Sequence, residues 1–219
     1  MVKAVVMDFD GLIFDTESVH YDIYQHYFQE RGAELPLEQW AEGVGTQGKV
    51  APARWLGEQL GRAVDEDAME AYHWREVARR LEQRTEPRSG VRDLLDQADQ
   101  LGMPLAVASS SPREWVERWL RHLQLRQRFK TVCTRDDVER VKPDPALYRL
   151  AAERLGVHPE NLLVFEDSVN GSQAALAAGA RCVVVPNRVT KHMDFDPVCR
   201  QLATFRGLDL EALLQELER

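Results

Sequence analysis

Short apolar runs alternate with stretches of helical periodicity over much of this chain. A short apolar run that stops at a polar or turn-forming residue is typical of a buried strand. Five such runs occur, at residues 4–7, 105–108, 131–133, 162–165 and 182–185. The segments between the later runs predict helices over 91–101, 112–123, 145–155 and up to residue 178. Strands that alternate with helices favour a parallel sheet. We therefore predict an α/β fold with a doubly wound, Rossmann-like parallel sheet.

The pattern differs between residues 15 and 87. Apolar positions such as Val19, Ile23 and Tyr27 follow helical spacing, and no strand-like run appears before about residue 83. Breaks fall at 32–36, 43–48 and 61, where glycines gather. We predict an all-helical cap domain over 15–87, inserted into a core domain made of residues 1–14 and 88–219. An insertion directly after the first strand lies over the end of that strand, which is the geometry of a lid.

Composition narrows the classes of function. With 219 residues, 44% of them hydrophobic, the chain is long enough for one substantial core with a small insertion. A formal net charge of −8 argues against a nucleic-acid surface, and no stretch is apolar enough to cross a membrane. Cys133, Cys182 and Cys199 form neither a disulfide framework nor a zinc motif. We expect a cytoplasmic protein with reduced thiols that acts as a monomer.

Polar residues at strand ends carry the candidate chemistry. The first strand stops at Asp8 and Asp10, followed by Gly11, and two carboxylates this close call for a cation or a proton between them. Parallel sheets bind ligands beyond the carboxyl ends of their strands, where both aspartates are expected. Taken alone, the pair is more simply interpreted as loop residues that cap nearby amides.

Two later stretches have similar alternatives. The second strand ends at Ser109, where a hydroxyl and helix N-terminal amides are suited to phosphate, whereas Ser111 and Glu114 are typical of a helix cap. Lys142 precedes a Pro-Asp-Pro turn in which Asp144 is expected to cap the next helix. A lone lysine is more often a solvated surface charge.

The fourth stretch is acidic again. The strand at 162–165 stops at Glu166 and Asp167, which are suited to Mg²⁺ as hard oxygen ligands. The structural alternative is that Asp167 or Ser168 caps the following helix. Two acidic strand ends, with a serine end and a Lys-Pro turn between them, predict one common site rather than four unrelated caps.

The order Asp-x-Asp-Gly, strand-end Ser, Lys-Pro and Glu-Asp resembles the four motifs of the haloacid dehalogenase superfamily of phosphotransferases. The helical insertion is similar to the small cap of its β-phosphoglucomutase-like and phosphoglycolate phosphatase-like branch. The resemblance implies that Asp8 is the nucleophile that forms an aspartyl phosphate and that Asp10 is the general acid and base. It implies Mg²⁺ held by Asp8, the Asp10 backbone carbonyl, Asp167 and Glu166, with Ser109 and Lys142 on the transferring phosphoryl group.

The resemblance also suggests substrate-binding positions. These are Gly11, His20, Gly43, Val44, Thr46, Ser110 and Ser111. The stretch 43–49 matches G-x-G-x-x-G and nearly a Walker A loop, but no strand precedes it and Val50 replaces the required Ser or Thr, so a nucleotide loop is disfavoured. The resemblance assigns residues 43–46 to a specificity loop of the cap instead. Thr46 lies there where mutases carry an arginine for a second phosphate, which favours hydrolysis over mutase chemistry.

We therefore predict a Mg²⁺-dependent phosphatase that acts on a small phosphorylated metabolite. A β-phosphoglucomutase-type sugar-phosphate mutase is the alternative enzyme. A binding or regulatory protein on an inactive core is less favoured, because Asp8, Asp10, Ser109, Lys142 and Asp167 are all present. The sequence does not identify the phosphate ester.

Overall fold

A computed structural model describes residues 1–46 and 50–218. Its centre is a six-stranded sheet in the order β3-β2-β1-β4-β5-β6, in which every neighbouring pair is parallel. The strands are β1 (Ala4–Met7), β2 (Leu105–Ala108), β3 (Thr131–Cys133), β4 (Leu162–Glu166), β5 (Arg181–Val184) and β6 (Arg200–Gln201). The parallel α/β sheet predicted from the apolar runs is therefore confirmed, with β1 at its centre.

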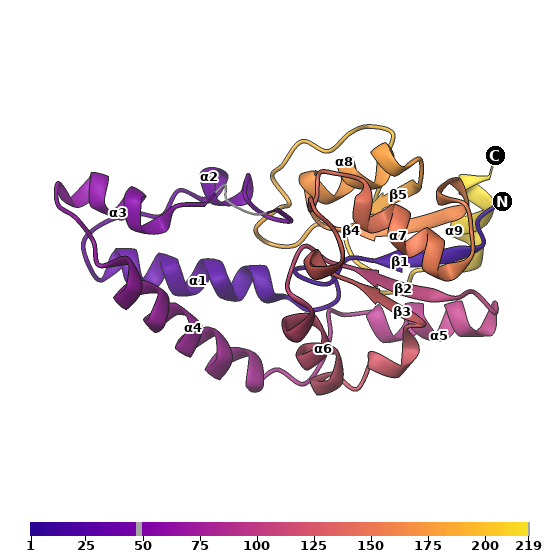
Figure 1. The fold of residues 1–219 in the computed structure, drawn as a ribbon, viewed down its shortest axis with the longest axis horizontal. Coiled ribbons are helices and arrows are strands. Elements are labelled where there is room, and N and C mark those ends of the chain that lie inside the picture. Colours follow the sequence, from indigo (N-terminus) through magenta and orange to yellow (C-terminus); the bar gives the residue numbers. More distant parts are fainter. Residues whose placement is uncertain (47–49, 219) are drawn as a thin grey trace.

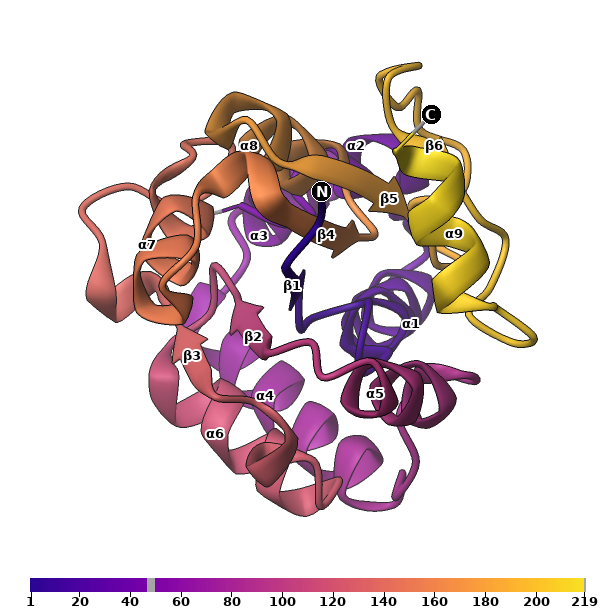
Figure 2. The same cartoon turned by 90° about the vertical axis from the view of Figure 1, so that its right-hand side faces the viewer.

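Helices cover both faces of the sheet, as Figures 1 and 2 show. They are α5 (Val91–Gln100), α6 (Arg113–His122), α7 (Ala146–Leu155), α8 (Val169–Ala178) and α9 (Leu210–Leu217). Val5 and Met7 of β1 pack in the core that contains α5, α6 and α9, whereas Ala4 and Val6 pack in the core that contains α7 and α8. Because successive strand residues point to opposite faces, a strand buried on both sides is apolar throughout.

Of the described residues between β1 and α5, those of four helices extend away from the sheet (Figure 1). These cap helices are α1 (Thr16–Gln29), α2 (Leu37–Ala41), α3 (Pro52–Leu60) and α4 (Glu66–Glu82). They enclose a core of their own around Tyr24, Trp40 and Leu56. Among the described residues of this insertion there is no strand, as the helical spacing predicted. The division into domains at residues 15 and 87 stays a prediction.

The ends of the helices differ slightly from their predicted positions. α6 begins at Arg113 with no side-chain cap, so the predicted capping role of Ser111 is wrong; the Ser111 hydroxyl is engaged elsewhere. Asp144 does accept a hydrogen bond at the start of α7, from the Ala146 amide at 3.0 Å. Ser168 caps α8 by accepting from the Gly171 amide at 3.1 Å, which leaves Asp167 available for another role.

The sequence pattern predicts no helix or strand after residue 185, but the structure contains two elements there, β6 and α9. β6 has only two residues, both exposed, and α9 packs on the sheet through Leu210 and Leu213. Three short 3₁₀ helices complete the fold, at Arg126–Arg128, Arg135–Asp137 and Pro159–Asn161. All three cysteines are buried free thiols. Within residues 1–46 and 50–218, no helix has the length and apolar character needed to cross a bilayer.

Candidate active site

The strand register brings the predicted site residues to one edge of the sheet. Met7 pairs with Val107 of β2 and with Phe165 of β4, so Asp8 follows β1 at the level where Glu166 ends β4. Ser109 follows β2, and its amide donates to the Cys133 carbonyl at 2.9 Å. Because the strands are parallel, their carboxyl ends meet here, as expected for ligand sites of open α/β sheets.

Lys142 lies at the bottom of the site rather than on the surface. Its side chain is 0% exposed, and its Nζ donates to Asp8 and, at 2.6 Å, to Glu166. Burial by itself lowers the pKa of this ammonium group, but the charges of Asp8 and Glu166 outweigh burial and raise it. The surface interpretation of Lys142 is therefore wrong, and the lysine carries a fixed positive charge between two carboxylates.

Three carboxylates converge around this lysine. Oxygens of Asp8, Glu166 and Asp167 lie within 4.8 Å of one another, and all three residues are buried. Burial, together with the charges of Glu166 and Asp10, raises the pKa of Asp8 to about 8 although Lys142 opposes it. Burial and the neighbouring carboxylates likewise raise the pKa of Asp167. The cluster thus lacks positive charge, which either protons or a cation supply.

The carboxylates of this cluster fit Mg²⁺ to different degrees. Asp167 Oδ2 accepts from Asn187 at 2.5 Å, whereas its Oδ1 is buried and has no hydrogen-bond partner among the described residues. An orphaned buried carboxylate oxygen is costly, and a hard cation is the ligand that satisfies it. Glu166 differs, because both of its oxygens already accept hydrogen bonds. Its donors are Lys142, Tyr148, the Asp167 amide and the Ser168 amide and hydroxyl.

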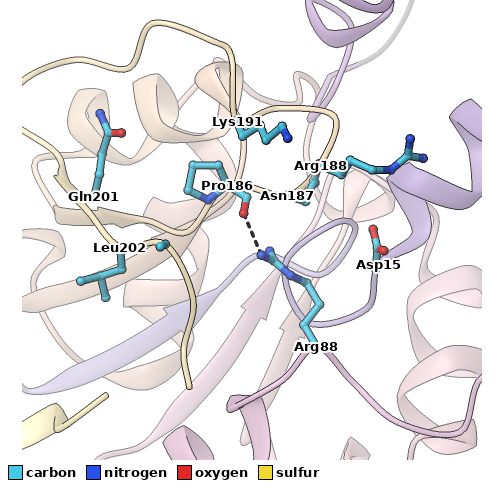
Figure 3. Close-up of a pocket in the computed structure, with 9 residues that line it drawn as sticks. Asp15, Arg88, Pro186, Asn187, Arg188, Lys191, Gln201 and Leu202 are labelled. Carbon is cyan, nitrogen blue, oxygen red and sulfur yellow. Dashed lines mark hydrogen bonds between the residues drawn. The ribbon is translucent and has the colours of Figure 1, made fainter. Parts of the chain in front are cut away.

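The loop after β1 is shaped by Gly11. This residue has φ +77°, and a Cβ there would collide with the Asp167 carboxylate and with Asn187. Arg88 supports the same loop from the far side, donating to the carbonyls of Gly11 at 2.7 Å, Val185 at 2.9 Å and Pro186 at 2.8 Å. Figure 3 shows the bond from Arg88 to the Pro186 carbonyl, with Arg188 and Lys191 among the other residues that line a second cavity of about 570 Å³. Because backbone carbonyls occupy the Arg88 guanidinium, the role of Arg88 in this cavity is to support the loop of the active site.

Asp10 is held by four donors rather than by the acidic cluster. Its carboxylate accepts from the hydroxyls of Thr16 at 2.9 Å, Ser109 at 3.2 Å and Ser111 at 2.7 Å, and from Trp115 Nε1 at 2.8 Å. These donors come from α1, the loop after β2 and α6, so Asp10 links the base of the cap to the sheet. Ser111, assigned by its local pattern to a helix cap, is a partner of Asp10 instead.

The predicted cap loop at 43–46 contacts the sheet edge directly. Thr46 Oγ1 donates to the Lys142 carbonyl at 2.5 Å, Ser110 donates to the Gly45 carbonyl at 2.9 Å, and Asn170 donates to the Val44 carbonyl at 2.8 Å. α2 ends just before this loop at Ala41, so the strand that a nucleotide-binding glycine loop requires is absent here. The rest of that glycine pattern, residues 47–49, lies outside the described residues.

A cavity of about 430 Å³ lies between the cap loop and the sheet edge. Most of its lining was predicted: Asp8, Asp10, His20, Gly43, Val44, Thr46, Ser109, Ser110 and Ser111. Trp74, for which packing between cap and core was the favoured interpretation, also lines it, as do Glu17 and Arg135, which the sequence pattern did not single out. Burial and the charges of Asp10 and Asp8 raise the pKa of Glu17 to about 8. From sequence, Glu17 is an ordinary acidic residue in the first turn of a helix.

Comparison with known proteins identifies the family. The model of the haloacid dehalogenase-like hydrolases matches residues 5–185 of the chain. The chain belongs to this family of hydrolases. Its similarity to individual members extends over nearly its full length, so the family match includes the cap helices as well as the sheet. The resemblance inferred from the four strand-end motifs is confirmed.

Three relatives illustrate this hydrolase branch. YhcW of Bacillus subtilis, which is named as a phosphatase, is 42% identical over 99% of this chain and 98% of its own. A phosphorylated carbohydrates phosphatase of Thermotoga maritima is 34% identical over 81% of this chain and 82% of its own. The crystal structure of CbbY from Rhodobacter sphaeroides with xylulose-1,5-bisphosphate has a TM-score of 0.72 at 28% identity, covering 95% of this chain and 96% of CbbY.

Proposed function

We propose that this hydrolase is a Mg²⁺-dependent phosphatase that cleaves a small phosphorylated metabolite, such as a sugar phosphate, through an aspartyl phosphate on Asp8. One observation carries the proposal: Asp8 is paired with the fully buried Lys142 and lies beside a buried Asp167 oxygen that has no hydrogen-bond partner among residues 1–46 and 50–218. A carboxylate approaches a phosphate dianion only where positive charge screens the two. We extend the proposal to a cytoplasmic monomer that acts on small molecules.

The residues divide the work of phosphoryl transfer among them. Asp8 supplies the attacking oxygen, while Lys142 and Ser109 hold the transferring group against it. Asp8, Asp167 and the Asp10 carbonyl would hold Mg²⁺, which when bound neutralises charge on the phosphoryl oxygens. Glu166, whose oxygens are saturated by donors, positions Lys142. Asp10 gives a proton to the leaving oxygen and then takes one from water. To do so, its carboxylate must give up at least one of the four hydrogen bonds that it accepts and contact the leaving oxygen or the water instead.

The alternative enzyme in this fold is a sugar-phosphate mutase. A mutase must bind the second phosphate of its bisphosphate intermediate while that intermediate reorients in the site. Thr46, the position at which mutases carry an arginine for this purpose, instead donates a hydrogen bond to the Lys142 carbonyl. The decisive experiment is ³¹P NMR of the protein with Mg²⁺ and a panel of small phosphate esters. Growth of inorganic phosphate supports the phosphatase. Conversion of one sugar phosphate into its positional isomer, with little free phosphate, establishes the mutase, and no change in any ester favours a non-catalytic protein.

Mg²⁺ is expected to stabilise EDTA-treated protein. At about a hundred times the dissociation constant, binding adds about 2.7 kcal/mol, which corresponds to a rise in Tm of roughly 5–10 °C for a chain of this size. Because burial raises the pKa of Asp8 to about 8, protons occupy the metal-free cluster below that pH. Metal-free stability therefore falls as the pH rises from about 4 toward 8, and the Mg²⁺ effect grows. Thermal melts with and without Mg²⁺, matched in ionic strength, check this; identical curves at every pH contradict it.

Arg135 is expected to attract the substrate. Of the described residues that line the cavity, it alone carries a permanent positive charge, and its one ion pair is with the adjacent Asp136 at 3.6 Å. Arg135→Gln should raise KM several-fold, about the effect of 1 kcal/mol, and leave kcat nearly unchanged, because among the described residues Arg135 pairs with Asp136 and not with Asp8. Arg140→Gln is the matched control, since Arg140 is exposed, pairs with Asp144 and does not line this cavity. Equal KM values for the two variants would exclude the role.

A further inference from the structure

Two histidines form a buried pair between α1 and α4 of the cap. His20 Nδ1 and His73 Nε2 are 2.7 Å apart, and the rings are stacked with centroids 4.9 Å apart. The far face of His73 stacks on Tyr24 at a centroid distance of 3.9 Å. His20 lines the catalytic cavity, whereas His73 is 2% exposed and does not line it. His73 therefore acts on the cavity indirectly, through its hydrogen bond to His20 and its ring contact with Trp74, which also lines the cavity.

The bond between the two rings contains a single proton, which has two possible positions. Burial lowers the pKa of His20 to about 4 and that of His73 to about 2, so both imidazoles are neutral at physiological pH. In one arrangement His20 Nδ1–H donates to His73, and His73 Nδ1 then carries the remaining proton. In the other, His73 Nε2–H donates to His20, and His20 Nε2 carries its proton into the cavity.

Two features of the structure select the second arrangement. His73 Nδ1 is buried and has no hydrogen-bond partner in the described part of the chain. Buried N–H groups without acceptors are rarer than acceptors without donors, so a bare lone pair at this atom is the better-tolerated state. In addition, Asp10 lines the same cavity as His20, and its negative charge acts on the His20 ring. A donor N–H on the side of the ring that lines the cavity is favoured over a lone pair beside this charge.

We propose that His73 is a positioning residue that fixes the Nε2–H tautomer of His20, so that His20 presents a hydrogen-bond donor to an oxygen of the bound phosphate ester. The inference rests on the proposed function in taking that ester as the occupant of the cavity. Tyr24, stacked on His73, keeps the imidazole plane in place. His20 belongs to cap helix α1 and also contacts Trp115 of α6, so the donor lies where the cap and the sheet edge meet.

Nitrogen NMR tests the tautomer without reference to activity. Long-range ¹H–¹⁵N correlation spectra of the full-length labelled protein distinguish protonated from bare ring nitrogens. We expect His20 and His73 both to carry the proton on Nε2 and to have a bare Nδ1. A proton on His20 Nδ1 overturns the proposal. Because this readout needs no turnover, it holds or fails separately from the phosphatase assignment.

Variants of His73 test the consequence for the substrate. His73→Gln keeps an amide N–H in the place of Nε2–H, whereas His73→Met keeps the bulk and removes the donor. We expect His73→Met to raise KM about two- to tenfold, the size of one neutral hydrogen bond, with kcat nearly unchanged, and His73→Gln to restore most of the loss. His26→Met, at an exposed histidine of α1, the helix that carries His20, is the control. Equal KM values for the Met and Gln variants overturn the proposal; if the Met variant fails to fold, the tautomer spectra decide.

Discussion

Asp8→Asn is expected to abolish phosphate release while leaving the protein folded. The asparagine amide has nearly the shape of the carboxylate but is a far weaker nucleophile, so no aspartyl phosphate forms. Removal of a nucleophile commonly lowers kcat by a factor of about 10⁴–10⁶. The fold should tolerate the change because Lys142 keeps Glu166 as its partner. Burial raises the pKa of Asp8 because it disfavours the charged carboxylate, so a neutral amide at this position is energetically tolerated.

The assay compares phosphate release and thermal melting of wild type, Asp8→Asn and Asp96→Asn. Asp96→Asn is the control, because it removes the same charge at an exposed position on α5, where Asp96 pairs with Arg128. In EDTA we expect the Asp8 variant to melt at or above the wild-type temperature, since one of three crowded carboxylates has lost its charge. Wild-type turnover in a folded Asp8→Asn protein would refute the nucleophile assignment.

The parts of the fold that the sequence could predict depend on local pattern and on one rule of sheet geometry. β1, β2 and β4 are buried on both faces, so each is an uninterrupted apolar run that ends where its polar residue begins. Parallel pairing then brings Asp8, Ser109 and Glu166 to one edge whatever the lengths of the connections between them. β6, with two exposed residues, offers no comparable pattern.

The rest of the site depends on tertiary contacts that leave no local pattern. The residues next to Lys142 in the sequence do not distinguish it from a surface lysine. It is shielded from solvent only because Asp8, Glu166 and Tyr148 pack around it in the folded protein. Arg135 and Glu17 reach the cavity because a loop after β3 and the first turn of α1 converge there. Trp115 is similar: helical spacing places it on α6, but its bond to Asp10 depends on how α6 meets the β1 loop.

Lys142→Met is expected to be the most destabilising single substitution at the site. Breaking a buried ion pair by removing one partner commonly costs about 3–5 kcal/mol, because the remaining charge stays buried without compensation. Here two carboxylates lose their shared partner, and both Asp8 and Glu166 are nearly inaccessible to water. Activity should vanish as well, since no other ammonium group reaches Asp8 among the described residues.

The loss should depend on pH in a defined direction. Lys142 lowers the pKa of Asp8 in the folded protein, so the variant raises that pKa further above the unfolded value. Between the two values the folded state binds the extra proton, and its stability decreases as the pH rises. Because the wild-type carboxyl is itself protonated below its pKa of about 8, the two proteins diverge only above that pH. Urea unfolding of metal-free protein should therefore show a smaller loss near about pH 7 and a larger one near about pH 9. An equal loss at both values would contradict the charge explanation and indicate lost packing instead.

A second substitution separates stability from catalysis. Glu166→Gln in the Lys142→Met background removes one of the two uncompensated carboxylates. The amide keeps one acceptor oxygen, which can serve either Tyr148, the donor to Oε1, or Ser168, the donor to Oε2. We expect the double variant to recover a large part of the unfolding free energy lost by Lys142→Met, and to remain inactive. If buried charge is what Lys142 compensates, the coupling between the two sites is large. A coupling near zero would mean that the lysine contributes to stability through its aliphatic chain.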